Sequence, residues 1–387
     1  MIKNELIKDI LTNTLFRLLS MINQIIPKDD HIILLYSNMG IRDNLKAIYD
    51  YMIENGYNYK YRIVMSGESK TCNKLPQNVS QVNNFAGVWW YLKAGHVFYA
   101  FGRIPIHPSK KQYVVQMWHG TPFKAPDQHQ LRTAPKKSYY TSMLISSLYF
   151  KDIIEKAHGI EDENIAVCGQ PRTDVMFKAC NKYQELEGYS KVVIWMPTFR
   201  KSSILGYSDV KKQKSVIPIF DIEDYQELNA TLNQKKILLI VKLHPLQDVE
   251  EFKSMNLSNL MLLSHEEFMQ RKWDLYKLMA QCDALITDYS SVFYDFMLLN
   301  RPLAFTIDDY NDYKEGRGFA VDNPDYLTPG YKITNKSQFH NFINDIADGK
   351  DIFKDERNKI NEIVNTYNDG NQCKRALNIA NVKMEDK

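Results

Sequence analysis

The length, composition and charge of the chain exclude several classes of protein. Its 387 residues, 44% of them hydrophobic and 25% charged, can bury large cores, and a chain of this size forms about two globular domains. The 49 Lys and Arg residues nearly balance the 46 Asp and Glu residues, so the net charge of +3 argues against nucleic acid as a partner. The five cysteines show no CxxC spacing, so neither a disulfide framework nor a metal site is indicated, and a reducing cytoplasm fits.

The first segment, residues 1–28, is predicted to form an amphipathic helix. Apolar residues recur there at roughly helical spacing with cations among them: Leu6, Ile10, Leu11, Leu15, Leu18, Leu19, Ile22, Ile25 and Ile26, with Lys3, Lys8 and Arg17. The segment has no secretory pattern, and no apolar stretch of the chain reaches the roughly 18 residues that span a bilayer. Two interpretations stay open: the helix packs on its own domain, or it lies on a membrane surface.

Strand and helix patterns then alternate along the first half of the chain. Strands are predicted at residues 31–36, 61–65, 97–100, 114–117, 144–146 and 165–168, and helices at 44–55, 88–93 and 148–157. Alternation of this kind is typical of βαβ units around a parallel sheet. We therefore predict a first Rossmann-like domain over residues 29–185.

The alternation restarts after the polar stretch 181–190. Strands are predicted at residues 192–196, 237–241, 261–263, 284–287 and 303–307, which indicates a second Rossmann-like domain over residues 186–365. Residues 366–387 are predicted to form a helical tail. The predicted fold class is therefore α/β, with two doubly wound domains facing a cleft.

Two serines stand where a predicted strand of the second domain ends. Ser290 and Ser291 follow the strand at 284–287, and a helical pattern begins at Val292. Ligands bind outside the carboxyl ends of the strands in open α/β sheets, and hydroxyl and N–H groups at a helix start can hold a diphosphate. The alternative is that the serines only cap the helix.

Two histidines occupy the same kind of position. His119 follows the strand at 114–117 and precedes Gly120, which lets the backbone approach a ligand. Because the pKa of histidine lies near neutrality, His119 can accept a proton from a hydroxyl group. His244 follows the strand at 237–241 and can donate a hydrogen bond or a proton to a leaving phosphate. The alternative for each is a purely structural histidine.

Six motifs of the chain resemble those of one family, and they occur in the same order. They are residues 118–122 (WHGTP), 169–174 (GQPRTD), 196–200 (MPTFR), 242–245 (KLHP), 287–291 (TDYSS) and 317–319 (RGF). They are similar to motifs of the CDP-glycerol glycerophosphotransferases, the family of the teichoic-acid primase and polymerase, and so is the stretch 37–52. The resemblance covers most of residues 31–330. It implies a two-domain transferase fold of the GT-B type, with CDP-glycerol held mainly by the second domain.

The resemblance also implies roles for individual residues. His119 matches the family's base, and His244 matches its second essential histidine. Donor binding is implied for Thr198, Arg200, Ser290, Ser291 and Arg317, and a place on the acceptor or interdomain side for Gly120, Thr121, Arg172 and Asp174. The chain departs from the family pattern at residue 199, at 320–322 and at 125–126, which lie near the expected acceptor path. These departures leave the acceptor open.

The reaction implied by the resemblance is attack by an acceptor hydroxyl on the β-phosphorus of CDP-glycerol, with release of CMP. The expected acceptor is a polyprenyl-diphosphate-linked glycan or poly(glycerol phosphate), in the synthesis of teichoic acid or a similar capsule polymer at the cytoplasmic face of an anionic membrane. No tightly bound cofactor is expected, and any Mg²⁺ would arrive on the donor diphosphate. Three alternatives stay open: CDP-ribitol as donor, a nucleotide-sugar glycosyltransferase of the same fold, and a non-catalytic binding module.

Overall fold

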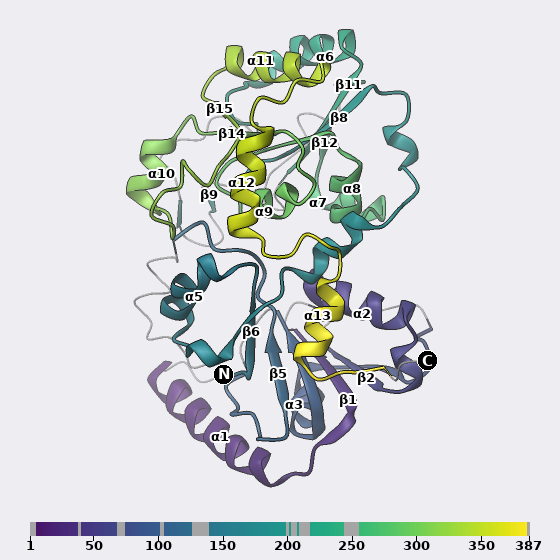
Figure 1. The fold of residues 1–387 in the computed structure, drawn as a ribbon, viewed down its shortest axis with the longest axis vertical. Coiled ribbons are helices and arrows are strands. Elements are labelled where there is room, and N and C mark those ends of the chain that lie inside the picture. Colours follow the sequence, from purple (N-terminus) through teal and green to yellow (C-terminus); the bar gives the residue numbers. More distant parts are fainter. Residues whose placement is uncertain are drawn as a thin grey trace. The chain divides into compact units, whose positions relative to one another are not determined.

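The computed structural model describes most of the chain, which divides into two compact units (Figure 1). The described backbone covers residues 5–37, 40–67, 74–100, 104–125, 139–198, 201–202, 207–208, 217–243 and 255–384, and the side chains are described except for residues 5–13, 201–202 and 207–208. The first unit comprises Met1–Gly120, Gln130–Asp174 and Asp369–Lys387, and the second comprises Thr121–His129 and Val175–Asn368. The middle segment of the first unit thus ends at Asp174, whereas the predicted first domain ended at residue 185. The first unit also contains the tail from Asp369 onward.

The first unit is built around a parallel sheet of seven strands. Their order across the sheet is β3-β2-β1-β4-β5-β6-β7, which is a doubly wound order. The strands are β1 (Asp29–Tyr36), β2 (Arg62–Ser66), β3 (Val79–Val82), β4 (Ala94–Tyr99), β5 (Tyr113–Gln116), β6 (Ser142–Ile145) and β7 (Ile165–Val167). The helices are α1 (Glu5–Ile25), α2 (Asn44–Glu54), α3 (Asn84–Lys93), α5 (Lys151–His158) and α13 (Gln372–Ile379).

The core of the first unit brings both ends of the sequence together. Ile33 and Leu35 of β1 are fully buried and lie in one cluster with Ile48 of α2 and with Ala376 and Leu377 of α13. Burial of large aliphatic side chains of this kind contributes about 1.5–3 kcal/mol each. Helix α13 is therefore a structural part of the first unit, although some two hundred residues separate it from the rest of that unit's chain.

The second unit repeats the architecture with a parallel sheet of six strands. Their order is β12-β11-β8-β13-β14-β15. The strands are β8 (Lys191–Met196), β11 (Ile237–Lys242), β12 (Leu260–Leu263), β13 (Ala284–Thr287), β14 (Leu303–Thr306) and β15 (Tyr331–Ile333), and β9 (Lys201–Ser202) pairs antiparallel with β10 (Tyr207–Ser208). The helices are α6 (Tyr225–Gln234), α7 (His265–Gln270), α8 (Leu275–Gln281), α9 (Val292–Met297), α10 (Tyr310–Gly316), α11 (Lys336–Ala347) and α12 (Lys354–Val364).

The core of the second unit is dense in aromatic rings. Trp195 of β8 is fully buried and stacks on Phe339 of α11, with ring centroids 5.4 Å apart. Leu239 and Ile286 fill the same cluster from the neighbouring strands β11 and β13. Because β8, β11, β13 and β14 all run parallel, their carboxyl ends meet at one edge of the sheet. The segments that follow these strands are the ones in which ligand-binding residues are expected.

Candidate active site

The loop that carries His119 has a strained backbone held by a side-chain amide. Trp118, directly after β5, has φ of 52°, a left-handed conformation that a tryptophan rarely adopts. The side-chain amide of Asn44, at the start of α2, donates hydrogen bonds to the carbonyl oxygens of Met117 (3.4 Å) and Trp118 (3.1 Å). The same amide group donates to Oε1 of Gln170 at 2.7 Å. Residues from three distant motifs therefore fix this loop.

Arg172 holds the next carbonyl group of the loop. Its Nη1 donates to the carbonyl oxygen of His119 at 2.9 Å and to both carboxylate oxygens of Asp43, at 2.8 and 2.9 Å. The side chain of Arg172 is 8% exposed, so the Asp43 carboxylate compensates a largely buried positive charge. Expected on the acceptor or interdomain side, Arg172 contacts the backbone of the histidine loop within the first unit.

The imidazole of His119 is exposed and has an environment that favours its neutral form. Surrounding protein atoms displace part of its water, and the positive charges of Arg172 and Arg42 add to this effect, so the pKa of His119 is lowered from 6.5. The carboxylate of Asp43 opposes the shift. The ring of Trp118 lies beside the imidazole of His119, with ring centroids 4.2 Å apart. A neutral, accessible imidazole can accept a proton from a hydroxyl group.

The motif that contains His119, residues 118–122, continues directly into the second unit. Gly120 and Thr121 are both buried, and the chain passes from the first unit to the second between them. Phe123 then packs edge-on against Phe293 of α9, with ring centroids 5.0 Å apart. The backbone at Phe123 accepts a hydrogen bond from the N–H of Ala320 at 2.9 Å.

Arg317 takes part in the same attachment. Its Nε donates to the carbonyl oxygen of Ala125 at 3.3 Å, and the N–H of Ala125 donates to the carbonyl oxygen of Gly318 at 3.0 Å. Residues 121–125 are thus joined to the loop 317–320 by an isolated antiparallel bridge between Lys124 and Phe319. Two motifs that the sequence places about 200 residues apart are neighbours in the second unit.

Thr198 and Asp288 join two further motifs at the ends of β8 and β13. The backbone N–H of Thr198 donates to Oδ2 of Asp288 at 2.6 Å, and its hydroxyl donates to Oδ1. Nζ of Lys124 donates to the Thr198 hydroxyl oxygen at 3.3 Å. Asp288 is 1% exposed, so its buried carboxylate holds the segment after β8 to the segment after β13. Its role was not foreseen from the sequence, although it stands in the TDYSS motif.

Ser290 and Ser291 follow Asp288 and are both half-buried. Ser291 is the N-cap residue of α9, but its side chain makes no capping hydrogen bond with the helix. The structure therefore does not support the alternative that the Ser291 side chain caps α9.

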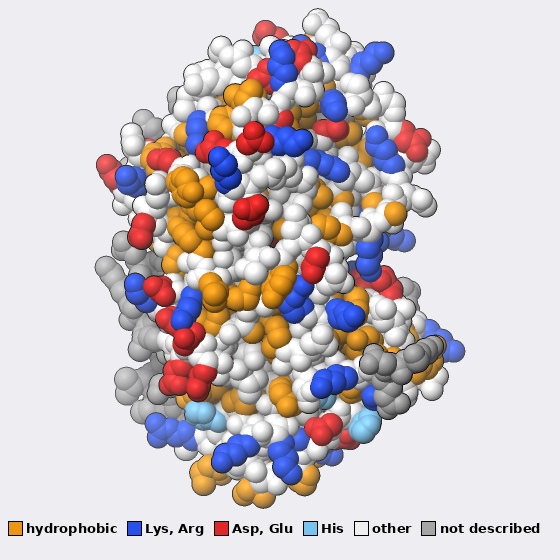
Figure 2. Space-filling model, in the orientation of Figure 1, with side chains coloured by type: hydrophobic (Ala, Val, Ile, Leu, Met, Phe, Trp, Pro, Cys, Tyr) orange, Lys and Arg blue, Asp and Glu red, His pale blue; other side chains and the backbone are white. Residues whose placement is uncertain are grey.

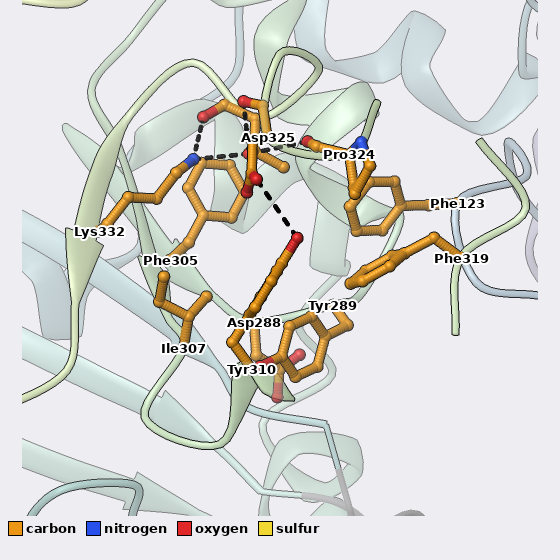
Figure 3. Close-up of a pocket in the computed structure, with 11 residues that line it drawn as sticks. Phe123, Asp288, Tyr289, Phe305, Ile307, Tyr310, Phe319, Pro324, Asp325 and Lys332 are labelled. Atoms are coloured by element: carbon orange, nitrogen blue, oxygen red, sulfur yellow. Dashed lines mark hydrogen bonds between the residues drawn. The ribbon is translucent and has the colours of Figure 1, made fainter. Parts of the chain in front are cut away.

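A pocket lies beside these residues, at the carboxyl ends of β13 and β14 (Figure 3). It encloses about 260 Å³ of empty space, including space open to solvent. Five of its eleven lining residues are aromatic: the lining is Phe123, Asp288, Tyr289, Phe305, Ile307, Tyr310, Phe319, Pro324, Asp325, Thr328 and Lys332. Sequence reasoning missed most of these residues, because they come from five separate stretches of the chain and form no local pattern.

Two polar contacts stand out within this pocket (Figure 3). Nζ of Lys332 lies over the ring of Phe305, 4.5 Å from its centroid, and donates to the hydroxyl oxygen of Thr328 at 2.5 Å. Burial lowers the pKa of Lys332 to about 8. The hydroxyl of Tyr310 donates to Oδ2 of Asp325 at 3.3 Å. Lys332 and Asp325 are therefore each bound to a neutral side chain of the pocket, Thr328 and Tyr310 respectively.

The remaining predicted residues fall elsewhere. Asp174 accepts hydrogen bonds from the backbone N–H groups of Gln372 (2.9 Å) and Cys373 (2.7 Å), so its carboxylate caps the start of α13. His244 and Arg200 lie outside the described residues.

Comparison with known proteins decides the family. The sequence model of the family described as CDP-Glycerol:Poly(glycerophosphate) glycerophosphotransferase matches residues 18–380. The chain belongs to this family. This membership confirms that the chain is a transferase of substituted phosphate groups, as the motifs indicated.

Individual relatives agree with this assignment. The chain is 27% identical over 344 residues to the teichoic acid poly(glycerol phosphate) polymerase of Bacillus spizizenii, covering 80% of this chain and 82% of that protein. It is 24% identical over 366 residues to the teichoic acid glycerol-phosphate primase of Bacillus subtilis, covering 87% and 88%. The solved structure of the wall teichoic acid polymerase TagF superposes with a TM-score of 0.71 at 21% identity, covering 98% of both chains. The predicted α/β fold of the GT-B type is confirmed.

Proposed function

We propose that this glycerophosphotransferase transfers glycerol phosphate from CDP-glycerol to a hydroxyl group of a lipid-linked glycan or poly(glycerol phosphate) chain, in the synthesis of teichoic acid or a similar capsule polymer. The observation that carries the proposal is the His119 loop, with its fixed backbone and an accessible imidazole whose pKa is lowered. An accessible neutral imidazole suits removal of a proton from an attacking hydroxyl group.

The proposed reaction is a single displacement at the β-phosphorus. The acceptor oxygen forms a bond to that phosphorus, and the bond from it to the bridging oxygen breaks. CMP leaves with the bridging oxygen, and His119 accepts the proton of the acceptor hydroxyl. Such reactions are accelerated chiefly by positioning and by stabilisation of charge on the phosphate oxygens.

The proposed donor contacts come from the second unit. Ser290 and Ser291 are half-buried at the carboxyl end of β13, where hydroxyl groups can donate to phosphate oxygens. Thr198 and Arg317 stand in the neighbouring loops, each held by the contacts described above. His244 and Arg200 complete the proposal on the strength of their motifs alone.

A panel of donors tests this function. The purified protein is incubated with CDP-glycerol, CDP-ribitol or a UDP-sugar, together with a polyprenyl-diphosphate-linked disaccharide, and the released nucleotide is identified. We expect CMP to be released from CDP-glycerol, at a rate at least ten times the rate of CMP release from CDP-ribitol. Release of UDP, or faster CMP release from CDP-ribitol, would replace it with one of the two alternative activities.

We further propose that no cofactor is tightly bound and that Mg²⁺ is carried in by the donor diphosphate. Among the described residues, no group of three or more His, Cys, Asp or Glu side chains is arranged to hold a metal ion. Mg²⁺ commonly binds through substrate phosphates and keeps several water ligands. Dialysis against EDTA should therefore leave the melting temperature unchanged, while activity returns in full when Mg²⁺ is added with the donor.

Helix α1 supports a proposed location at the cytoplasmic face of an anionic membrane. Its polar side chains hold it to the first unit: the amide of Asn23 donates to Oε1 of Gln112 and to the carbonyl oxygen of His107, both at 2.8 Å. The hydroxyl oxygen of Ser20 accepts the N–H of His107 at 3.0 Å. The helix therefore packs on its own unit through polar contacts, as one of the two sequence interpretations required.

Four large apolar side chains of the same helix are exposed to solvent. Leu15 and Leu18 are each 54% exposed, Met21 is 67% exposed and Ile25 is 81% exposed. Figure 2 shows hydrophobic side chains with Lys and Arg beside them at the end of the molecule where Figure 1 places α1. An apolar helix face flanked by cations suits the surface of an anionic bilayer. None of the helices in the described ranges is long and apolar enough to cross one.

A further inference from the structure

An ion pair between Asp43 and Arg172 holds the backbone around His119. Asp43 precedes α2 and has φ of 57°, and Trp118 has φ of 52°. Both are left-handed non-glycine residues, and such conformations persist only where the surroundings enforce them. One side chain connects Asp43 to the residue that follows Trp118, because Nη1 of Arg172 donates both to the Asp43 carboxylate and to the carbonyl oxygen of His119.

The attachment is rigid on the side of Arg172 as well. The backbone N–H of Arg172 donates to Oδ1 of Asn44 at 3.1 Å, and the side-chain amide of Asn44 donates to the carbonyl oxygen of Trp118 at 3.1 Å. Arg172 is 8% exposed and Asp43 is 19% exposed, so water competes little for either group. A displacement of Asp43 must therefore move the guanidinium group that holds the loop.

We propose that Asp43 and Arg172 are positioning residues for His119: Asp43 fixes the guanidinium group, which orients the His119 backbone, and the two charges together set the proton affinity of the imidazole. Neither residue touches the substrate in this account. The inference rests on the proposed role of His119 as the base, but it concerns a property of the free enzyme, which can be measured without turnover.

The electrostatic part of the inference has a definite sign. Within the described ranges, the charged groups that act on His119 are Arg172 and Arg42, which disfavour its protonated form, and Asp43, which favours it. The ring of His158 stands edge-on to that of Trp118, with centroids 4.4 Å apart. Removing the negative charge of Asp43 should lower the affinity of His119 for a proton, and removing the positive charge of Arg172 should raise it.

Four variants test the inference by NMR titration of the labelled imidazole of His119, with its signal assigned by loss in His119→Gln. Asp43→Asn should move the titration midpoint to lower pH by about half a unit, and Arg172→Gln should move it to higher pH by a similar amount. Both shifts should be smaller than the roughly one to three pH units that a neighbouring charge causes at a buried site, because the His119 ring is exposed and solvent screens the charges. The double variant should return to within about 0.2 units of the wild type. Asp50→Asn, which breaks an exposed ion pair with Lys46 on α2, is the matched control and should change nothing.

Kinetics with CDP-glycerol test the positioning part. Asp43→Asn, Arg172→Gln and the double variant should each lower kcat at least tenfold, with the KM for CDP-glycerol changed less than twofold, because the donor contacts lie in the second unit. Arg172→Lys keeps the charge but loses the planar fork, so it should restore the titration midpoint without restoring kcat.

The outcomes separate the possible failures. Shifts of the midpoint in the same direction for Asp43→Asn and Arg172→Gln, or none in either, would overturn the inference. An unchanged kcat in both Asp43→Asn and Arg172→Gln would also overturn the inference. If the midpoints shift as expected while His119→Gln retains full activity, the base role proposed for His119 is wrong, and the electrostatic part of the inference stands. A variant that unfolds is replaced by the double variant, which removes both charges together.

Discussion

Thr198 binds both carboxylate oxygens of Asp288. The backbone N–H of Thr198 donates to Oδ2 at 2.6 Å, and its hydroxyl donates to Oδ1. Thr198, in the loop after β8, therefore binds both carboxylate oxygens of Asp288, in the loop after the neighbouring strand β13. Asp288 is 1% exposed and stands two residues before Ser290. The pair therefore fixes the start of the segment in which the proposed donor contacts lie.

Replacing Thr198 with valine tests this link. The change removes the hydroxyl group and leaves a buried carboxylate oxygen without that donor, and a hydrogen bond to a charged group contributes about 1.5–3 kcal/mol. We expect the KM for CDP-glycerol to rise at least tenfold, measured by CMP release. Thr198→Ser keeps the hydroxyl group and should stay within about threefold of the wild type. Equal effects of the two variants would show that the hydroxyl group does not matter.

The double variant Ser290→Ala and Ser291→Ala tests the donor site itself. Since the side chain of Ser291 makes no capping hydrogen bond, the loss of both hydroxyl groups should change the stability of α9 little. The affinity for CDP-glycerol, measured by calorimetry, should fall at least tenfold, because two donors to phosphate oxygens are lost. An unchanged affinity together with a lower melting temperature would make these serines structural.

Asp174 is expected to act on stability and not on the reaction. Its carboxylate caps α13 through the N–H groups of Gln372 and Cys373, and loss of such a cap costs about 0.5–2 kcal/mol. Asp174→Ala should therefore lower the free energy of unfolding by about that amount in urea titrations. Its kcat should remain within about twofold of the wild type. A large fall in kcat at unchanged stability would instead support the acceptor-side role that the motif implied.

Most strands of the two parallel sheets could be predicted from the sequence, but the edge strands β3 and β15 could not. Most predicted strands agree with the structure to within one to three residues at their ends, because continuous apolar runs mark buried parallel strands. β3 (Val79–Val82) was missed, since all four of its residues are only half-buried. β15 (Tyr331–Ile333) is three residues long and likewise carries no pattern of its own.

The positions of His119 and Ser290 could be predicted, but not the residues that hold them. Strand ends can be read from local patterns, whereas the contact between Asn44 and Gln170 joins residues 126 positions apart. The left-handed backbone of Trp118 gives no signal either, because a glycine would be the expected residue there. Asp43 lies in a stretch that resembles the family, yet only the structure shows that it pairs with Arg172.

Vesicle binding tests the surface of α1. The triple variant Leu18→Gln, Met21→Gln and Ile25→Gln changes three exposed side chains, so it should not affect folding. Its binding to anionic vesicles in co-sedimentation should fall at least tenfold, and wild-type binding should weaken with salt. Leu148→Gln changes an equally exposed leucine elsewhere in the first unit and is the matched control. Unchanged binding of the triple variant would exclude α1 as the contact.

The fate of the β-phosphorus of CDP-glycerol distinguishes transfer of glycerol phosphate from transfer of glycerol alone. The protein is given CDP-glycerol with radioactive phosphorus in the β position, together with a lipid-linked acceptor, and the label is followed into the products. The account predicts that the label enters the acceptor with glycerol and that the released nucleotide is unlabelled CMP. Labelled CDP with an unlabelled acceptor would mean that the carbon–oxygen bond of glycerol is broken, as in a glycosyltransferase, and would contradict the account.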